Sequence, residues 1–279
     1  MYAALNTIDA SYGRRQAFAT CGSSWWVLES RTRPATFKLA RDFCHDRWCV
    51  ACAAQRATVV AGNLLQAIGD RPTRLVTLTV RSTNTPLKAQ ITHLLTSFRR
   101  LRRRPLWSTH VDGGCGLLEI TYNDQTSQYH PHLHCVTVGR FLPQDSLAND
   151  WEACTGDSRI VDIRFVNNRD AAAKYVTKYL TKPITMAAYR DPPILAESIA
   201  ALRGVKQLIT FGTWRTKKLL HPLTDDAWTS LGHWHELLAN GYDRHAELVD
   251  AILRNPARAV IGEFTLADLD HGLPQERPP

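Results

Sequence analysis

The chain has 279 residues, of which 44% are hydrophobic, and a formal net charge of +8. This apolar content suffices for one or two packed domains and excludes a wholly disordered protein. No apolar run reaches the roughly 20 residues of a membrane span, and no signal-peptide core follows Arg14-Arg15, so we expect a cytoplasmic protein without a membrane partner. Seven cysteines in such a chain indicate metal binding or free thiols rather than disulfides.

The positive charge is concentrated in the middle of the chain. Residues 71–220 carry 22 basic and 11 acidic side chains, whereas residues 221–279 carry 4 and 10. A basic segment favours a polyanionic partner, and nucleic acid is the leading candidate.

The first cysteines form a metal-binding pattern. Cys44, Cys49 and Cys52 are spaced as Cys-x4-Cys-x2-Cys, and Cys21 lies 23 residues before Cys44. Four thiolates on tight turns are typical of a closed, tetrahedral Zn²⁺ site. His45 is an alternative to Cys21 as the fourth ligand, and four reduced cysteines without metal are the alternative to the whole site.

The order of the expected elements predicts three segments. Residues 1–70 would be a zinc-binding module that ends in a helix over 53–68. Residues 71–220 would be an α/β catalytic domain. Residues 221–279 would be helical, with a flexible acidic tail over 263–279. In the middle segment we expect strands over 75–80, 116–122, 132–138, 159–166 and 205–211, and a loop over 189–194. We expect helices there over 86–104, 145–154 and 169–182, with Asn168 as the N-cap of the last one and Pro183 just past its end. In the last segment we expect helices over 225–239 and 245–254.

A histidine pair begins one of these strands. His132 and His134 flank Leu133, and residues two apart in a strand point to the same face. Glu119 lies in the preceding strand, and the polar segment 123–128 reads as the hairpin loop that would bring it beside the histidines. Two imidazoles and a carboxylate leave coordination positions open, as a catalytic ion requires. Solvated histidines at a strand end are the alternative.

Two other groups of residues suggest contacts with nucleic acid. The helix over 86–104 ends in a basic run that exceeds what helix capping requires, so we expect contacts with phosphates from Arg99, Arg100, Arg102, Arg103 and Arg104. Further along, Trp214 and Arg215 combine an aromatic ring with a cation, as single-strand binders do, although a surface turn explains them equally well. His233 and His235 are not expected to be ligands, because residues two apart diverge on the predicted helix.

A helix with two tyrosines follows the histidine strand. Tyr175 and Tyr179 are four residues apart and share one helix face, beside a stripe that includes Lys178 and Lys182. A tyrosine hydroxyl is a poor nucleophile at its usual pKa near 10, and a divalent ion with a nearby ammonium would assist it. Two tyrosines at this spacing ordinarily pack in a protein core. A catalytic role is favoured here because the histidine pair and Glu119 lie in the same basic segment.

Taken together, these motifs resemble the HUH endonucleases, and in particular the rolling-circle replication initiators of plasmids and phages. The resemblance rests on His132-Leu133-His134, on the Tyr-x-x-Lys helix and on the order in which they occur. Arg47 to Cys52 also resembles the Arg-x-Cys-x-x-Cys end of the cysteine clusters in many plasmid initiators. The likeness covers roughly residues 20–220.

The resemblance implies a ferredoxin-like antiparallel sheet with a metal site at its centre. It also implies that a tyrosine attacks single-stranded DNA at a replication origin, leaving a 5′-phosphotyrosine and a 3′-OH for a host polymerase, with a host helicase as a further partner. By position, His132, His134 and Glu119 would hold Mg²⁺ or Mn²⁺, and Lys178 and Lys182 would face the phosphate.

One departure from the family pattern concerns the class of initiator. Single-tyrosine initiators can carry a glutamate four residues before the tyrosine, but here Ala171 precedes Tyr175 by four residues. The sequence therefore fits the two-tyrosine class, in which both hydroxyls act in turn, with Tyr175 slightly preferred as the first nucleophile.

Three other functions remain open. An HUH transposase or a relaxase would carry the same motifs. A zinc-containing DNA-binding regulator would use the tyrosines only for packing and would form no covalent adduct. An iron oxygenase with two histidines and a carboxylate is disfavoured, because position 134 is His where that motif places Asp or Glu.

Overall fold

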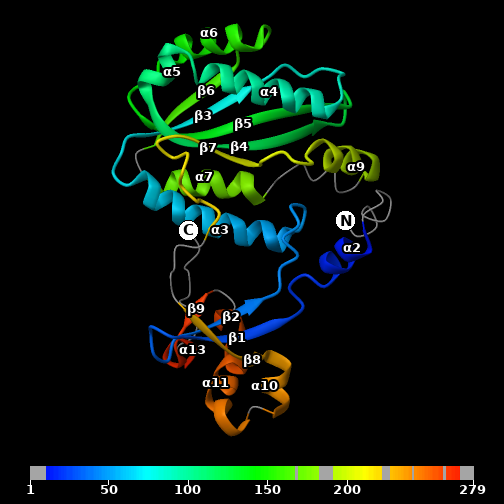
Figure 1. Ribbon diagram of the computed structural model, residues 1–279, viewed down its shortest axis with the longest axis vertical. Coiled ribbons are helices and arrows are strands. Elements are labelled where there is room, and N and C mark those ends of the chain that lie inside the picture. Colours follow the sequence, from blue (N-terminus) through cyan, green and yellow to red (C-terminus); the bar gives the residue numbers. More distant parts are fainter. Residues whose placement is uncertain are drawn as a thin grey trace. The chain divides into compact units, whose positions relative to one another are not determined.

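The computed structural model describes residues 11–166, 169–181, 191–221, 227–240, 242–259 and 262–270 (Figure 1). The fold is α+β, in agreement with the antiparallel α/β fold that the sequence predicts, and it contains two antiparallel sheets where the sequence predicts one. The chain forms two compact units, one of residues 1–15 and 46–223 and the other of residues 16–45 and 224–279. The first described helix, α2, spans Tyr12–Ala19.

The first unit is built on a five-stranded sheet with the order β6-β3-β5-β4-β7. All neighbouring strands are antiparallel, and β5 occupies the centre. The strands are β3 (Thr73–Thr79), β4 (Val111–Asn123), β5 (Gln128–Gly139), β6 (Val161–Val166) and β7 (Leu208–Gly212).

Helices cover both faces of this sheet, with α4 and α6 on one face and α3 and α7 on the other (Figure 1). Alternation along β5 divides its side chains between the faces: Val136 and Val138 pack in the core on the α3 and α7 side, whereas Leu133 and Cys135 point to the α4 side. The helices are α3 (Val50–Ile68), α4 (Leu87–Leu101), α5 (Pro105–His110), α6 (Gln144–Thr155), α7 (Arg169–Thr181) and α9 (Pro192–Ala201).

The second unit is a four-stranded sheet with the order β8-β1-β2-β9. Its core combines Val27 and Phe37 from the N-terminal strands with Val249, Ile252 and other residues of the C-terminal helices. The elements are β1 (Trp25–Ser30), β2 (Phe37–Arg41), β8 (Trp228–His233), α10 (Trp234–Asn240), α11 (Tyr242–Arg254), α12 (Pro256–Ala259), β9 (Glu263–Phe264) and α13 (Leu266–Asp270).

The two compact units do not coincide with the three consecutive segments predicted from the sequence. Residues near the N-terminus and near the C-terminus share one sheet, because β1 pairs with β8 and β2 pairs with β9. Pairing between strands so far apart in the sequence leaves no local sequence signal. A division of the chain at residues 70 and 220 therefore could not include it.

Three local predictions were wrong. The helix expected over 225–239 begins only at Trp234, because residues 228–233 pair with β1 as strand β8. The expected flexible tail contains β9 and α13 within its described part, residues 263–270. The loop expected over 189–194 is the start of α9 from Pro192 onward, where the Asp191 side chain accepts a hydrogen bond from the Ile194 amide at 3.4 Å and caps the helix.

The described helices are also informative about membranes. None of them combines the length and the apolar character that crossing a bilayer requires.

Candidate functional site

The site lies on the face of the central strands that α7 covers. The pairing register places Thr79 and Glu119 opposite His132, and Thr77 and Leu117 opposite His134. Residues paired across an antiparallel sheet point to the same face. Toward the other end of these strands the same face is apolar and belongs to the core, with Leu75, Cys115, Leu117, Val136 and Val138. The polar site therefore begins where the core ends.

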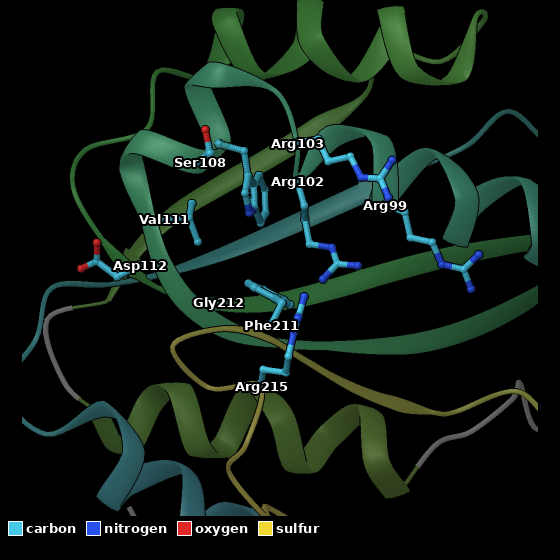
Figure 2. Close-up of a pocket in the computed structure, with 10 residues that line it drawn as sticks. Arg99, Arg102, Arg103, Ser108, Val111, Asp112, Phe211, Gly212 and Arg215 are labelled. Atoms are coloured by element: carbon cyan, nitrogen blue, oxygen red, sulfur yellow. The ribbon is translucent and has the colours of Figure 1, made fainter.

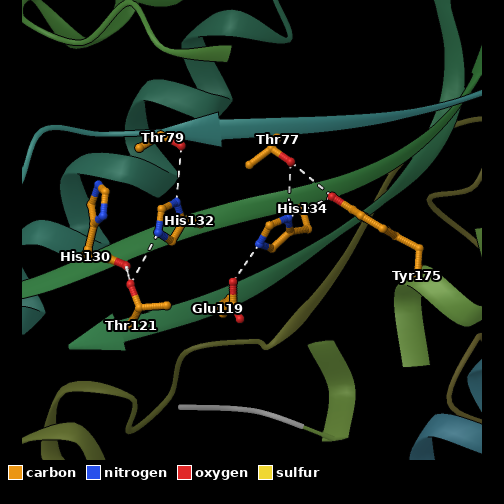
Figure 3. A network of polar contacts seen from close by, with 8 residues as sticks. All are labelled: Thr77, Thr79, Glu119, Thr121, His130, His132, His134 and Tyr175. Atoms are coloured by element: carbon orange, nitrogen blue, oxygen red, sulfur yellow. Dashed lines mark hydrogen bonds and ion pairs between the residues drawn. The ribbon is translucent and has the colours of Figure 1, made fainter. Parts of the chain in front are cut away.

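His134 connects the sheet to helix α7. Its Nε2 lies 2.8 Å from Oε2 of Glu119, and its Nδ1 lies 2.8 Å from the hydroxyl of Tyr175 (Figure 3). Thr77 Oγ1 lies 3.0 Å from the same tyrosine hydroxyl. The predicted nucleophile, one predicted imidazole ligand and the predicted carboxylate thus form one continuous hydrogen-bonded chain.

His132 lies one step further along β5 and has different partners. Its Nδ1 is 3.2 Å from Thr79 Oγ1, and its Nε2 is 3.4 Å from Thr121 Oγ1. Burial, reinforced by the neighbouring His130 and His134 and opposed by Glu119, lowers the pKa of His132 to about 4. At neutral pH the ring is therefore uncharged, which is the form that binds a metal ion.

Both tyrosines of α7 face the histidines. The Tyr179 ring is stacked on His134 with 3.6 Å between ring centroids and 13° between planes, and it is only 8% exposed. Burial, together with Tyr179, raises the pKa of Tyr175 above its ordinary value, and the hydrogen bond between Tyr175 and Thr77 partly opposes this. Tyr175 is therefore a neutral phenol at physiological pH. Among the predicted lysines, Lys178 Nζ lies 5.2 Å from the Tyr179 ring centroid, and Lys182 lies outside the described residues.

The three predicted ligands share one face but do not converge on one point. Glu119 contacts His134, whereas the ring centroids of His132 and His134 are 6.0 Å apart. The donor set nevertheless fits a divalent ion, because it offers two imidazoles and a carboxylate on adjacent strands.

The four N-terminal cysteines do converge. Among the described residues, Cys21, Cys44, Cys49 and Cys52 form a group whose sulfur atoms all lie within 4.8 Å of one another. The group includes Cys21 and not His45. A cluster of this kind could hold a metal ion such as zinc.

The predicted nucleic-acid residues separate into two kinds. Arg100 donates to the Cys154 carbonyl at 3.3 Å, and Arg104 forms an ion pair with Asp150 at 2.5 Å, so both have protein partners. Arg99, Arg102 and Arg103 instead line a pocket with Arg215 (Figure 2).

Trp214 does not fit its predicted role in base stacking. Its side chain is 0% exposed and belongs to the core on the α3 side of the sheet. The sequence pattern of an aromatic ring beside cations could not distinguish this buried ring from an exposed one.

Sequence reasoning assigned no role to several residues of the site. Thr77, Thr79 and Thr121 hydrogen-bond the histidines or Tyr175, and His130 Nε2 lies 3.1 Å from the Val80 carbonyl. The alternation of threonines along β3 was the available signal, because it placed them on one face.

Comparison with known proteins gives the family. Residues 36–236 match the model of the replication protein family Rep_1. The chain belongs to this replication protein family.

Several curated relatives carry the name "Protein rep". One from Streptococcus pneumoniae serotype 2 is 28% identical over 192 residues, which are 60% of this chain and 59% of that protein. One from a Bacillus species is 30% identical over 161 residues, 51% of this chain and 52% of that protein. One from Staphylococcus aureus is 29% identical over 158 residues, 48% of this chain and 69% of that protein. The chain thus spans somewhat more than half of the first two relatives, and no solved structure matches it.

The lowered pKa of His132 predicts a loss of stability in acid. The unfolded chain takes up a proton at this side chain near the ordinary pKa of 6.5, whereas the folded chain does so only near 4. The free energy of unfolding should therefore be unaffected above pH 6.5 and should fall as the pH drops from 6.5 to 4, by at most about 3 kcal/mol from this residue.

The measurement is urea denaturation without added divalent ions at several pH values. His132→Asn should lose less stability over this interval than the wild type, and the control His93→Asn, at an exposed position on α4, should follow the wild type. Equal acid sensitivity of His132→Asn and the wild type would contradict the assignment.

Proposed function

We propose that this replication protein initiates rolling-circle replication by cutting and rejoining single-stranded DNA at an origin. The observation that carries the proposal is the chain of contacts from Tyr175 through His134 to Glu119, with 2.8 Å at each step. Family membership supports a role in replication, and the net charge of +8 suits a nucleic-acid substrate. The resemblance to HUH endonucleases points to the same chemistry.

In the proposed reaction, Tyr175 Oη forms a bond to the scissile phosphorus and the bond from phosphorus to the 3′ oxygen breaks. The phenol loses its proton and the departing 3′ oxygen gains one, so the products are a 5′-phosphotyrosine and a free 3′-OH. Thr77 and His134 orient the attacking hydroxyl through their hydrogen bonds. The 3′-OH would then serve a host polymerase as a primer, with a helicase opening the duplex.

The divalent ion would be held by His132, His134 and Glu119. When bound, Mg²⁺ or Mn²⁺ would neutralise charge that develops on the phosphate oxygens. The protein's own contribution is to keep the His132 imidazole uncharged by burial and to position the Glu119 carboxylate through its 2.8 Å contact with His134.

The two tyrosines would have different tasks. The Tyr175 hydroxyl contacts the polar groups of the sheet, whereas the Tyr179 ring packs flat against His134 and is 8% exposed. We therefore assign the first cleavage to Tyr175. Tyr179 would hold the His134 ring in place during that step and act as nucleophile in a later strand transfer.

Removing each hydroxyl tests this assignment. On an origin oligonucleotide with Mn²⁺, Tyr175→Phe should reduce the covalent protein–DNA adduct by at least about 100-fold, because the nucleophile is lost. Tyr179→Phe keeps the stacked ring and should still form the first adduct but fail to rejoin strands. Denaturing gels give both readouts.

A binding assay is the control, because Tyr175→Phe should bind the oligonucleotide as the wild type does. Wild-type amounts of adduct from Tyr175→Phe would contradict its role as the first nucleophile. Binding by all proteins with no adduct from any of them would favour a DNA-binding regulator instead.

The cysteine cluster is proposed to hold structural Zn²⁺. Cys52→Ser should lower the zinc content of the purified protein from about one equivalent per chain toward zero, as measured by elemental mass spectrometry. Cys154→Ser changes a buried cysteine outside the cluster and should leave the zinc content unchanged. Zinc retention in Cys52→Ser, or its absence from the wild type, would refute the assignment.

A further inference from the structure

A second concentration of charge lies on the other side of the sheet from the tyrosines. A pocket of about 440 Å³ opens between the end of α4, α5 and the turn after β7, and its lining residues are Arg99, Arg102, Arg103, Trp107, Ser108, Val111, Asp112, Phe211, Gly212 and Arg215. Phe211 pairs with Gly114 across the sheet, and its ring contacts Phe98 of α4 at 5.4 Å between centroids. The pocket therefore lies on the α4 face, whereas His134 and Tyr175 lie on the α7 face.

The four arginines of this pocket have no ion-pair partner among the described residues. Figure 2 shows Arg102 and Arg215 extending toward each other, with Asp112, the one carboxylate among the lining residues, at the other side of the pocket. Within the described ranges, none of the four arginines takes part in an ion pair, in contrast to the neighbouring Arg104, which binds Asp150. Four cations held together without anions cost free energy, which a bound anion would recover.

Among the four arginines, Arg102 gives the most specific evidence for a bound anion. Its Nε is buried and has no hydrogen-bond partner in the described structure. Burial is the largest cause that lowers the pKa of Arg102, and Arg215, Arg99 and Arg103 add to it by repulsion. A buried donor without an acceptor is costly, and an oxygen of a bound anion would satisfy it.

The pocket is shaped by ring contacts and by a glycine turn. The Arg102 guanidinium carbon lies 4.9 Å from the Phe98 ring centroid and 5.8 Å from that of Phe211, which fixes the side chain by cation–π contact. Gly212 has a φ of +59°, and a Cβ there would lie 2.3 Å from the Asp112 carbonyl oxygen. Only glycine fits this turn, which brings Arg215 to the pocket.

We propose that this pocket binds backbone phosphates of a DNA segment other than the one that is cut, as a second DNA contact on the face of the sheet opposite Tyr175. Phosphate is the anion that matches several guanidinium forks at once. The choice of DNA as the source of the phosphate rests on the proposed function; the phosphate chemistry of the pocket does not.

Charge-removing variants test the proposal. Arg102→Gln/Arg215→Gln should weaken binding of an origin oligonucleotide by about 10-fold or more near 100 mM salt, and should flatten the slope of log K against log salt concentration by about 1.5 to 2, because two phosphate contacts are lost. Fluorescence anisotropy over a salt series measures both. Arg99→Gln/Arg103→Gln changes two exposed side chains, so it should leave the fold intact, and it should weaken DNA binding in the same direction.

The matched control is Arg159→Gln/Arg164→Gln, which removes the same charge within β6 and just before it, at the opposite edge of the same sheet. These arginines are ion-paired with Glu152 and Asp162, so their loss should change DNA affinity less than about twofold. The proposal is overturned if the pocket variants bind DNA as the control does. It is also overturned if pyrophosphate binds the pocket, as shown by calorimetry on wild type and variants, while DNA affinity is independent of the four arginines.

The DNA affinity and its salt dependence are measured independently of DNA cleavage. At saturating DNA the pocket variants should still form the Tyr175 adduct, whereas Tyr175→Phe should lose the adduct and keep the steep salt dependence. Failure of the cleavage reaction would therefore leave the binding result interpretable, and the reverse also holds.

Discussion

The register in which β5 pairs with β3 and β4 is the constraint on which the site depends. It brings Thr77, Glu119 and His134 to one face, opposite helix α7, and it leaves Leu133 and Cys135 on the other. A shift of β5 by one residue would turn both predicted histidine ligands into the core beneath α4 and would point apolar side chains at Tyr175. The apolar residues of the same strands prevent this shift, because Val136 and Val138 are 0% exposed in the core. Core packing thus fixes the position of the reactive groups.

The sequence predicted this part of the molecule well for a physical reason. Strand alternation and helical spacing are local, so the common face of His132 and His134, and that of Tyr175 and Tyr179, follow from short stretches of sequence. The hairpin that brings Glu119 to the histidines is also short, with its turn between Asn123 and Gln128. The contacts of the threonines with these groups depend on how α7 packs on the sheet, and local spacing does not contain that information.

Other features could not be predicted because they depend on distant partners. The sequence predicts a helix where strand β8 lies, because the pairing partner β1 is about two hundred residues away in the sequence. The run of five arginines looked uniform, yet Arg100 and Arg104 bind protein groups while Arg102 faces a pocket. The sequence predicts that Trp214 stacks on bases, but its side chain is buried. In each case tertiary packing decides among side chains that the sequence leaves equivalent.

The two faces of the sheet therefore have different chemistry. One presents imidazoles, a carboxylate and phenols at hydrogen-bonding distances, which suits bond making and breaking at a phosphate. The other presents guanidinium groups in a pocket, which suits holding phosphates without reacting with them. Under the proposed function the protein would use one face to cut DNA and the other to retain it.

Identification of the tyrosine that becomes linked to DNA is the most direct test of the central claim. Trypsin cuts after Lys174 and Lys178, so Tyr175 and Tyr179 fall on different peptides. The protein would be reacted briefly with an origin oligonucleotide and Mn²⁺, treated with nuclease and trypsin, and analysed by tandem mass spectrometry. The account predicts a nucleotide on the peptide that begins at Tyr175. A nucleotide found at early times only on the Tyr179 peptide, or cleavage of the DNA without any modified tyrosine, would contradict it.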